Sequence, residues 1–194
     1  KERIMNLKKA LIERRSIRRF KQTEVDKKDL VYLVDMARRA PFAANGQQLR
    51  YLIVVQPRLV HEVFNRTAWA AYVKPRRDPV WGVSSPMAFI AVSAPKYGAS
   101  QEVNVGAALQ SMSLAAHGIG LGSCWLGAFR KEEVAKILMV PNDRELLYLM
   151  AIGYPDETPV SEDIRGDESV KYYLDDNDVL HVPKIRAEDL IEWH

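Results

Sequence analysis

The sequence is poor in the residues that build metal centres and covalent cross-links. Its 194 residues include one cysteine, Cys124, which excludes an internal disulfide and a multi-cysteine zinc site. The four histidines are scattered along the chain and show no metal-ligand spacing. We therefore expect no bound metal and, from the low cysteine content, a reducing cytoplasmic setting.

Long apolar runs and a large excess of one charge are also missing. Residues 1–20 are charged and contain no apolar segment typical of a secretory signal. The least polar stretch, 103–126, is interrupted by polar residues and glycines, which favours a buried helix and strand over a membrane span. The net charge of +3 requires no polyanionic partner. We expect one globular domain over residues 1–194, with no broad nucleic-acid face.

The common nucleotide-binding and hydrolase motifs are absent as well. Residues 118–123 (GIGLGS) look like a dinucleotide fingerprint, but the third glycine would fall on Ser123 and the segment follows a helix, not a strand. No Walker A, G-x-S-x-G or H-E-x-x-H pattern occurs. Cys124 stands in an apolar segment, where a cysteine is more often a small core residue, although a Cys-His pair stays open.

Apolar periodicity and boundary residues predict a mixture of helices and strands. Helices are expected at 6–14, 26–39, 58–66, 101–117 and 131–139. Strands are expected at 50–56, 86–95, 121–127 and 145–154, the first of them buried on both faces. Because the elements do not alternate as strict βαβ units, the predicted fold class is α+β.

The remaining segments are less regular. Residues 67–85 are rich in aromatic residues and prolines, which is typical of a lid or pocket wall, or of a loop anchored by its aromatics. Residues 155–178 are acidic and are expected to form a loop, followed by a strand candidate at 179–182 and a helical turn at 187–193. Small residues crowd the helix at 101–117, which we expect in the core or at a subunit interface.

The most informative stretch is a dense arginine cluster directly after the first helix. Arg14, Arg15, Arg18 and Arg19 fall within six residues, with Ser16 among them. A guanidinium presents a planar fork of donors that matches phosphate oxygens. Like charges this close repel one another unless an anion binds between them. Taken alone, such a cluster is more often a solvated basic turn or a weak nucleic-acid patch.

Other segments belong with this cluster. They are 37–47 (ARRAPFAANGQ), 106–125 (from GAALQ to GSCW), 151–155 (AIGYP) and a basic pair, Lys184 and Arg186. Together with RRSIRRF at 14–20, they resemble the FMN-dependent nitroreductase family, in the family's order and over nearly the whole chain. The resemblance implies a mainly antiparallel sheet flanked by helices. It also implies a homodimer with two FMN sites at its interface, in which residues 155–194 form a C-terminal arm exchanged between subunits.

The resemblance implies a role for each matching residue. The FMN phosphate and ribityl chain would be held by Arg14, Arg15 and Ser16, with Lys184 and Arg186 closing on the same phosphate. The N1–O2 edge of the flavin ring would lie near Arg18. The residues that would border the ring from the partner subunit are Pro41, Phe42, Ala43 and Asn45. The strand passing along the ring would supply Trp125, Leu126 and Gly127, with the Gly127 N–H aimed at N5.

The implied chemistry needs no catalytic side chain, because the flavin carries the redox step. NAD(P)H would be a transient co-substrate, and a nitro compound, quinone or related small acceptor would follow it in ping-pong order. Phe42 stands where the family commonly has a small polar residue, which narrows the acceptor pocket. The family's mid-chain flavin contact has no clear counterpart within 66–82.

Other functions fit the same residues. The flavin fold could serve reductive dehalogenation or flavin destruction, with residues 67–85 as a substrate lid. A non-enzymatic flavin-binding protein and a nucleic-acid binder are the remaining alternatives, although nucleic-acid binding usually shows a larger charged stripe.

Overall fold

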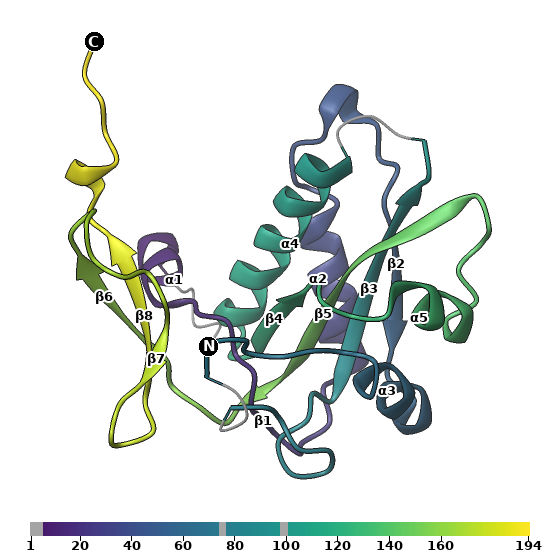
Figure 1. Cartoon of the computed structure of the whole chain (residues 1–194). Helices are drawn as coiled ribbons and strands as arrows, with labels where there is room; N and C mark the ends of the chain where they lie inside the picture. The colour runs from purple at the N-terminus through teal and green to yellow at the C-terminus, as the bar shows by residue number, and fades with distance from the viewer. Residues whose placement is uncertain (1–5, 74–76, 98–100) are drawn as a thin grey trace.

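The computed structural model of this protein describes residues 6–73, 77–97 and 101–194. Its centre is an antiparallel sheet in which the strands lie in the order β1–β5–β3–β2, with β4 also paired to β5 (Figure 1). The strands are β1 (Phe20–Lys21), β2 (Arg50–Val54), β3 (Ala88–Pro95), β4 (Gly122–Leu126) and β5 (Arg144–Pro155). The predicted α+β class is confirmed.

Helices cover both faces of this sheet (Figure 1). One face packs against α2 (Lys27–Ala37) and α4 (Gln101–Gly118), the other against α3 (Pro57–Phe64) and α5 (Lys131–Ile137). Within β3, Phe89 and Ala91 join the core beneath α3 and α5, while Ile90 and Val92 join the core beneath α2 and α4. Successive strand side chains point to opposite faces, so one continuous apolar strand supplies two cores.

Local chemistry sets the helix boundaries where the sequence predicted them. The Asp26 carboxylate accepts the N–H of Lys28 at 2.9 Å and so caps the first turn of α2. That helix ends at Ala37, shortly before Pro41, and α3 begins with Pro57 in its first turn. No helix in the described ranges is both long and apolar enough to cross a bilayer.

The prediction that the strand at 50–56 is buried on both faces is wrong. Within the described chain, β2 pairs with β3 alone and forms an edge of the sheet. Arg50 is exposed, and Ile53 keeps 38% of its surface exposed. An apolar run bounded by turn residues does not distinguish a central strand from an edge strand, which explains the error.

Two glycines hold the arginine segment against the sheet. A Cβ atom at Gly122 would lie 2.9 Å from the side chain of Ile17, and one at Gly153 would lie 2.9 Å from that of Phe20. Both apolar side chains are buried, so the missing side chains of the glycines make room for them. The backbone between Ile17 and Phe20 is therefore anchored on either side of the second arginine pair.

The chain after Pro155 forms a second, three-stranded sheet, so the predicted loop at 155–178 is wrong. Its strands are β6 (Val160–Ile164), β7 (Tyr173–Leu174) and β8 (Leu180–Ile185), in the order β6–β8–β7. Leu180 is fully buried and anchors this sheet in the core shared with α3 and α5. The strands are short and largely polar, so their apolar alternation is too weak to be seen in the sequence. The short β1 was missed for the same reason.

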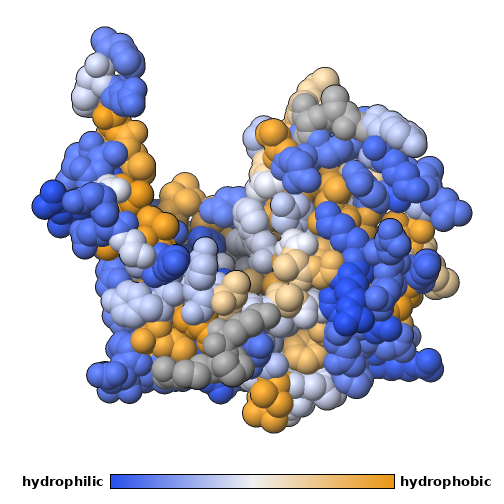
Figure 2. Space-filling model, in the orientation of Figure 1, coloured by the Kyte–Doolittle hydropathy of each residue, from blue (hydrophilic) through white to orange (hydrophobic). Residues whose placement is uncertain are grey.

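This C-terminal arm stands beside α1 (Leu7–Glu13), and the chain end projects away from the main sheet (Figure 1). The predicted helical turn at 187–193 is reduced to a 3-10 turn at Ala187–Asp189. Beyond it, Leu190 is 67% exposed and Trp193 is 90% exposed. The surface is hollowed between this projecting end and the main body (Figure 2).

Candidate functional site

Arg14 and Arg15 lie where α1 ends, at a cavity of about 310 Å³. One Arg15 guanidinium nitrogen donates to the Arg14 carbonyl at 2.6 Å, and another donates to the Ser161 hydroxyl on β6. Among the residues that the structure describes, the Nε atoms of both arginines are buried without a hydrogen-bond partner, as is the Nε of Arg77. Within the described ranges, neither guanidinium forms an ion pair with a carboxylate. The pair is an anion site in its chemistry.

The pKa shifts of Arg14 and Arg15 also favour a bound anion. Burial lowers the pKa of Arg14. Burial also lowers the pKa of Arg15, and the neighbouring Arg14 charge lowers it further. Both effects disfavour the charged forms, and a bound anion would oppose both. Ser16, the next residue, forms an isolated parallel bridge with Ser123 and so ties the pair to the start of β4.

Arg18 is held through its backbone and its side chain. Its N–H donates to a carboxylate oxygen of Glu157, which also accepts the Arg19 N–H at 3.2 Å. The Arg18 guanidinium lies over the Tyr172 ring, 5.2 Å from the centroid, at a cation–π distance. In the part of the chain described here, that guanidinium forms no ion pair.

The basic pair near the C-terminus, Lys184 and Arg186, lies on or directly after β8, the strand that pairs with the Ser161-bearing β6. Ser161, which binds Arg15, is the register partner of Val182 in the parallel pairing of β6 with β8. Residues two apart on a strand share a face, so Lys184 lies on the face that Arg15 contacts. Arg186 continues this extended run, and its N–H donates to the Ile164 carbonyl at 3.0 Å. The arm therefore places Lys184 on the face that meets Arg15, but neither Lys184 nor Arg186 lines the cavity at Arg14 and Arg15.

The segment containing Pro41, Phe42, Ala43 and Asn45 does not join them. The Ala43 N–H donates to Asn104 at 3.0 Å, in the first turn of α4. The last turn of α4 carries His117, which lies 3.9 Å from Glu13 beside the arginine pair. At 1.5 Å per residue, these two points on the helix are about 20 Å apart. A single chain keeps the two halves of the predicted site separate.

The same segment has an unusual backbone. Ala44 and Asn45 both have a φ of 50°, and Gln47 has a φ of 47°. Residues with side chains rarely adopt this left-handed conformation, and such strain is concentrated at functional sites.

The end of β4 is partly exposed, at Trp125 and at Gly127, which follows the strand. The Trp125 indole N–H donates to the Ser113 hydroxyl of α4 at 2.6 Å, which fixes a ring that is 37% exposed. The Leu126 side chain is buried, so only its backbone can face a ligand. Gly127 is exposed, and a Cβ there would lie 3.2 Å from the Tyr148 ring.

Cys124 is a core residue. Its side chain is 3% exposed, and burial raises the pKa of its thiol, with the Glu157 charge adding to the rise and Arg18 opposing it. A buried thiol of raised pKa carries little reactive thiolate, so the Cys-His alternative loses its basis.

The residues that sequence reasoning missed are contacts of long range. Glu157, Tyr172, Ser113 and His117 touch the predicted site residues from the arm and from α4. None of them sits in a recognisable motif. Only Glu157 had a signal, because it closely follows the segment AIGYP at 151–155.

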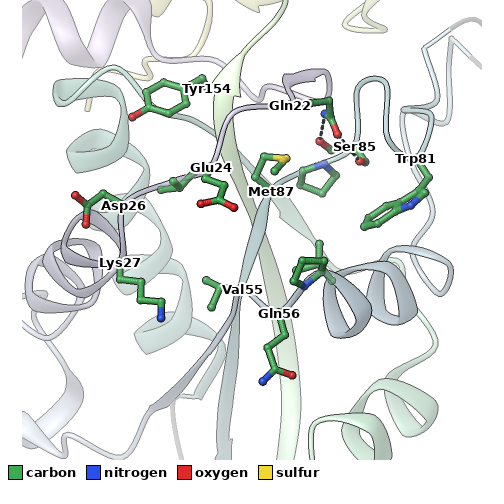
Figure 3. A pocket seen from close by; sticks show the side chains of 14 residues that line it. Gln22, Glu24, Asp26, Lys27, Val55, Gln56, Trp81, Ser85, Met87 and Tyr154 are labelled. Carbon is green, nitrogen blue, oxygen red and sulfur yellow. Dashed lines mark hydrogen bonds between the residues drawn. The ribbon is translucent and has the colours of Figure 1, made fainter.

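A larger cavity, of about 740 Å³, lies between the start of α2 and the start of α3 (Figure 3). None of the predicted site residues lines it. Two of its polar side chains are used within the fold: Asp26 caps α2, and the Gln22 amide donates to the Ser85 carbonyl at 2.9 Å. Its exposed Trp81 ring stacks on His61 at 4.4 Å. The smaller cavity, with unsatisfied cations, is the better candidate site.

The connection at 67–85 is anchored where it is described. Trp69 and Val73 are buried in the core, and Arg77 is 4% exposed. Residues 74–76, which belong to the predicted lid or pocket wall, lie outside the described residues.

A sequence profile of the nitroreductase family matches residues 11–154, which is most of the chain. The chain belongs to the nitroreductase family. A relative from Methanothermobacter thermautotrophicus, a candidate NADH dehydrogenase/NAD(P)H nitroreductase, is 25% identical over 82% of this chain and 83% of its own length. Iodotyrosine deiodinase from Thermotoga neapolitana is 28% identical over 82% of this chain and 94% of its own.

Solved nitroreductase structures share the fold. An FMN-dependent nitroreductase from Clostridium difficile superposes with a TM-score of 0.62 at 24% identity, over 78% of this chain and 88% of the other. The antiparallel sheet with helices on both faces is therefore the nitroreductase fold, as the resemblance in sequence implied.

Proposed function

We propose that this nitroreductase-family protein is an FMN-dependent NAD(P)H oxidoreductase that reduces nitro compounds, quinones or a related small acceptor. The observation that carries the proposal is the Arg14–Arg15 pair, which is half-buried at a cavity with no carboxylate partner in the described chain. The names of the Methanothermobacter relative and the Clostridium structure support the nucleotide and the cofactor.

The residues present fit an FMN phosphate. A phosphate monoester brings nearly two negative charges, which would satisfy the two orphaned Nε atoms and offset the repulsion between the guanidiniums. Arg14, Arg15 and Ser16 would hold it from the N-terminal side, and Lys184 and Arg186 from the arm. Such a charge balance would explain why the fold tolerates Arg14 and Arg15 side by side.

When bound, the flavin would accept a hydride from NAD(P)H and deliver electrons to the second substrate. Arg18 would add a fixed positive charge beside the ring, oriented by Tyr172 and by the Glu157 contact to its backbone. The Gly127 N–H would donate to N5 from an exposed strand end. Because the sequence contains no dinucleotide fingerprint, nucleotide and acceptor would occupy one place in turn, which is a ping-pong order.

The site would be completed by a second copy of the chain. The 41–45 segment is about 20 Å from the arginine pair along α4, so it would serve the partner's cofactor rather than its own. The projecting end leaves Leu190 and Trp193 exposed beside a hollow surface (Figure 2), and an exchanged arm would cover them. We therefore propose a homodimer with two sites.

The colour and cofactor content of the purified protein test this function. The expected result is a yellow protein whose extracted cofactor is FMN by chromatography, and whose absorbance at the flavin band falls on anaerobic addition of NAD(P)H alone. Restoration of that band by a nitroaromatic or a quinone identifies the acceptor class. Uptake of FAD, or of no flavin, would reject the proposal.

A second candidate reaction is reductive dehalogenation. The alignment with the Thermotoga iodotyrosine deiodinase covers nearly the whole length of that enzyme, which favours this alternative over the others. Halide release from a halogenated phenol, measured with an ion-selective electrode, separates the two. Halide release faster than nitroaromatic or quinone reduction would make dehalogenation the main reaction.

A further inference from the structure

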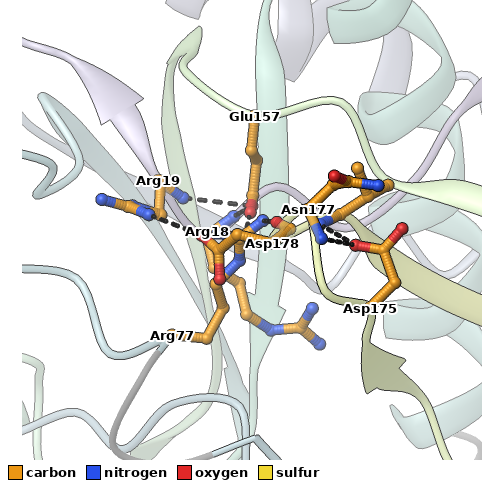
Figure 4. Close-up of polar contacts among 8 residues, drawn as sticks. Arg18, Arg19, Arg77, Glu157, Asp175, Asn177 and Asp178 are labelled. Atoms are coloured by element: carbon orange, nitrogen blue, oxygen red, sulfur yellow. Dashed lines mark hydrogen bonds and ion pairs between the residues drawn. The ribbon is translucent and has the colours of Figure 1, made fainter.

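Arg77 belongs to the connection at 67–85 and lies close to the arginine segment, beside Glu157 and Asp178 of the arm (Figure 4). Its side chain is 5% exposed, and its Nε lies 3.1 Å from a carboxylate oxygen of Glu157, which is 2% exposed; within the described residues these two atoms form an ion pair without a hydrogen bond. Its other nitrogens reach Asp178, donating to the carboxylate at 2.8 Å and to the backbone carbonyl at 3.0 Å. One buried cation therefore binds two carboxylates of the arm.

Glu157 is shared between Arg77 and the arginine segment. While one carboxylate oxygen pairs with Arg77, the other accepts the N–H groups of Arg18 and Arg19. Asp178 also lies 3.6 Å from the Arg19 guanidinium. The geometry joins the middle connection, the arm and the arginine segment at a single buried carboxylate.

The charge of Glu157 also acts close to Arg18. Burial is the largest influence on the pKa of the Cys124 thiol; Arg18 and, to a smaller extent, Arg14 lower that pKa and Glu157 raises it, so these charges act on one sulfur. The Arg18 guanidinium is attached to the same residue whose N–H Glu157 already accepts. A buried carboxylate without a counter-ion is strongly unfavourable and draws in a nearby cation.

We propose that Arg77 is a positioning residue that neutralises Glu157 and so keeps the Arg18 guanidinium unpaired and directed at the cofactor site. Without Arg77, Glu157 pairs with Arg18 and cancels the positive charge that Arg18 presents. This inference rests on the proposed FMN function, because the benefit of an unpaired Arg18 is its interaction with the flavin.

A purely structural role for Arg77 makes a different prediction. In that case each variant loses FMN affinity in proportion to its loss of stability, whatever happens to the charge of Glu157. In the charge-sequestering role, affinity follows the charge left near Arg18. Removing Arg77 and Glu157 together then restores affinity, even though stability is not restored in full.

The test is a fluorescence titration of the apoprotein with FMN, with a urea unfolding curve for each variant. Arg77→Gln is expected to weaken FMN binding on the order of tenfold, and the double variant Arg77→Gln/Glu157→Gln to return within about threefold of the wild type. The bound flavin in Arg77→Gln is expected to have a lower reduction potential, because less positive charge faces it. A double variant as weak as the single one overturns the inference.

Two further variants keep the test decisive if Arg77→Gln does not fold. Glu157→Gln alone retains an oxygen for the two N–H groups and is expected to bind FMN at least as tightly as the wild type; a loss of tenfold overturns the inference. Arg66→Gln is the matched control, because it breaks a 2.9 Å ion pair with Glu133 away from the arginine segment; its FMN affinity is expected to be unchanged.

Absence of FMN binding by the wild type overturns the proposed function and this inference together. Wild-type binding with no effect in Arg77→Gln overturns the inference alone.

Discussion

Arg77 and the Arg14–Arg15 pair are buried arginines with opposite surroundings. Arg77 pairs with Glu157 and contacts Asp178 through two groups, all within one chain. Arg14 and Arg15 have, in the described chain, no carboxylate partner, and this absence is what separates them from Arg77, because the Nε atoms of all three lack a hydrogen bond there. Burial of a charge is tolerated when its ionic partners are present, so the charge of Arg77 is balanced on folding, whereas the other pair is complementary to an external anion. The Arg77 Nε and the Glu157 oxygen that faces it form this ion pair without a hydrogen bond.

Breaking the completed site is expected to have the largest effect on stability. Arg77→Met leaves the 2% exposed Glu157 carboxylate without its cation, which typically destabilises a protein by about 3–5 kcal/mol. Urea unfolding of the apoprotein measures the loss. The double variant with Glu157→Gln should recover part of it, and a loss below about 1 kcal/mol in the single variant would contradict the comparison.

Breaking the incomplete site is expected to change binding instead. Arg14→Ala removes a charge-assisted contact to the phosphate, about 1.5–3 kcal/mol or ten- to hundredfold in FMN affinity, with little loss of stability. Equilibrium titration with FMN measures the change. Arg58→Ala, which removes an exposed surface arginine, is the control. Equal FMN affinities for Arg14→Ala and wild type would remove Arg14 from the site.

Displacing the arginine segment at 14–20 is expected to have an intermediate effect, on stability and on FMN binding together. At Gly122 a new Cβ would lie 2.9 Å from Ile17, so Gly122→Ala forces a shift that should destabilise the fold by about 1–3 kcal/mol and weaken FMN binding as well. Gly118→Ala has open space and serves as the matched control. Thermal unfolding and FMN titration of the two variants should separate them clearly. Indistinguishable variants would show that the segment is not held by this contact.

The smallest expected effect is a pH dependence of the arm. His181 lies between Glu162 at 3.2 Å and Asp175 at 3.3 Å. Burial lowers its pKa, but hydrogen bonds and charge from the two carboxylates outweigh burial and raise it above the ordinary histidine value. The Tyr173 ring stacks on it at 4.9 Å.

A raised folded pKa fixes the sign of that dependence. The stabilisation is fully present below the ordinary histidine pKa and is lost as pH rises through the raised value of the folded state. Hydrogen exchange of the β8 amides, corrected for intrinsic rates, should show protection falling over that window, and His181→Gln should flatten the curve. Protection that rises with pH would reverse the assignment.

How far the fold follows from sequence depends on the strength of local pattern. The apolar runs of β3 and β5, the Asp26 cap and the proline at the start of α3 were all predicted because each has a local cause. The edge position of β2 and the polar strands of the arm were not. Both depend on which segments lie beside them, and that information is not contained in a window of neighbouring residues.

The site divides in the same way. The arginine cluster and the basic pair were identified from composition and from the family resemblance; Arg14 and Arg15 line one cavity, whereas Lys184 and Arg186 do not line it. Arg77 and Glu157 were missed, because their pairing joins distant segments; Arg77 has no distinctive local setting, and Glu157 is marked only by its place shortly after AIGYP. Residues 41–45 are distinctive only in their backbone conformation. The left-handed φ values of Ala44 and Asn45 were not predicted from those two residue types.

The span of α4 between Asn104 and the arginine pair has a genetic consequence. If each site takes its arginines from one chain and its 41–45 segment from the other, two differently defective chains can rescue each other. A chain with Arg14→Ala and a chain with an Asn45 substitution would each bind FMN weakly alone. Random pairing makes half of the dimers mixed, and each mixed dimer contains one intact site, so co-expression should restore about a quarter of the wild-type sites. Two alleles altered in the same segment would restore none.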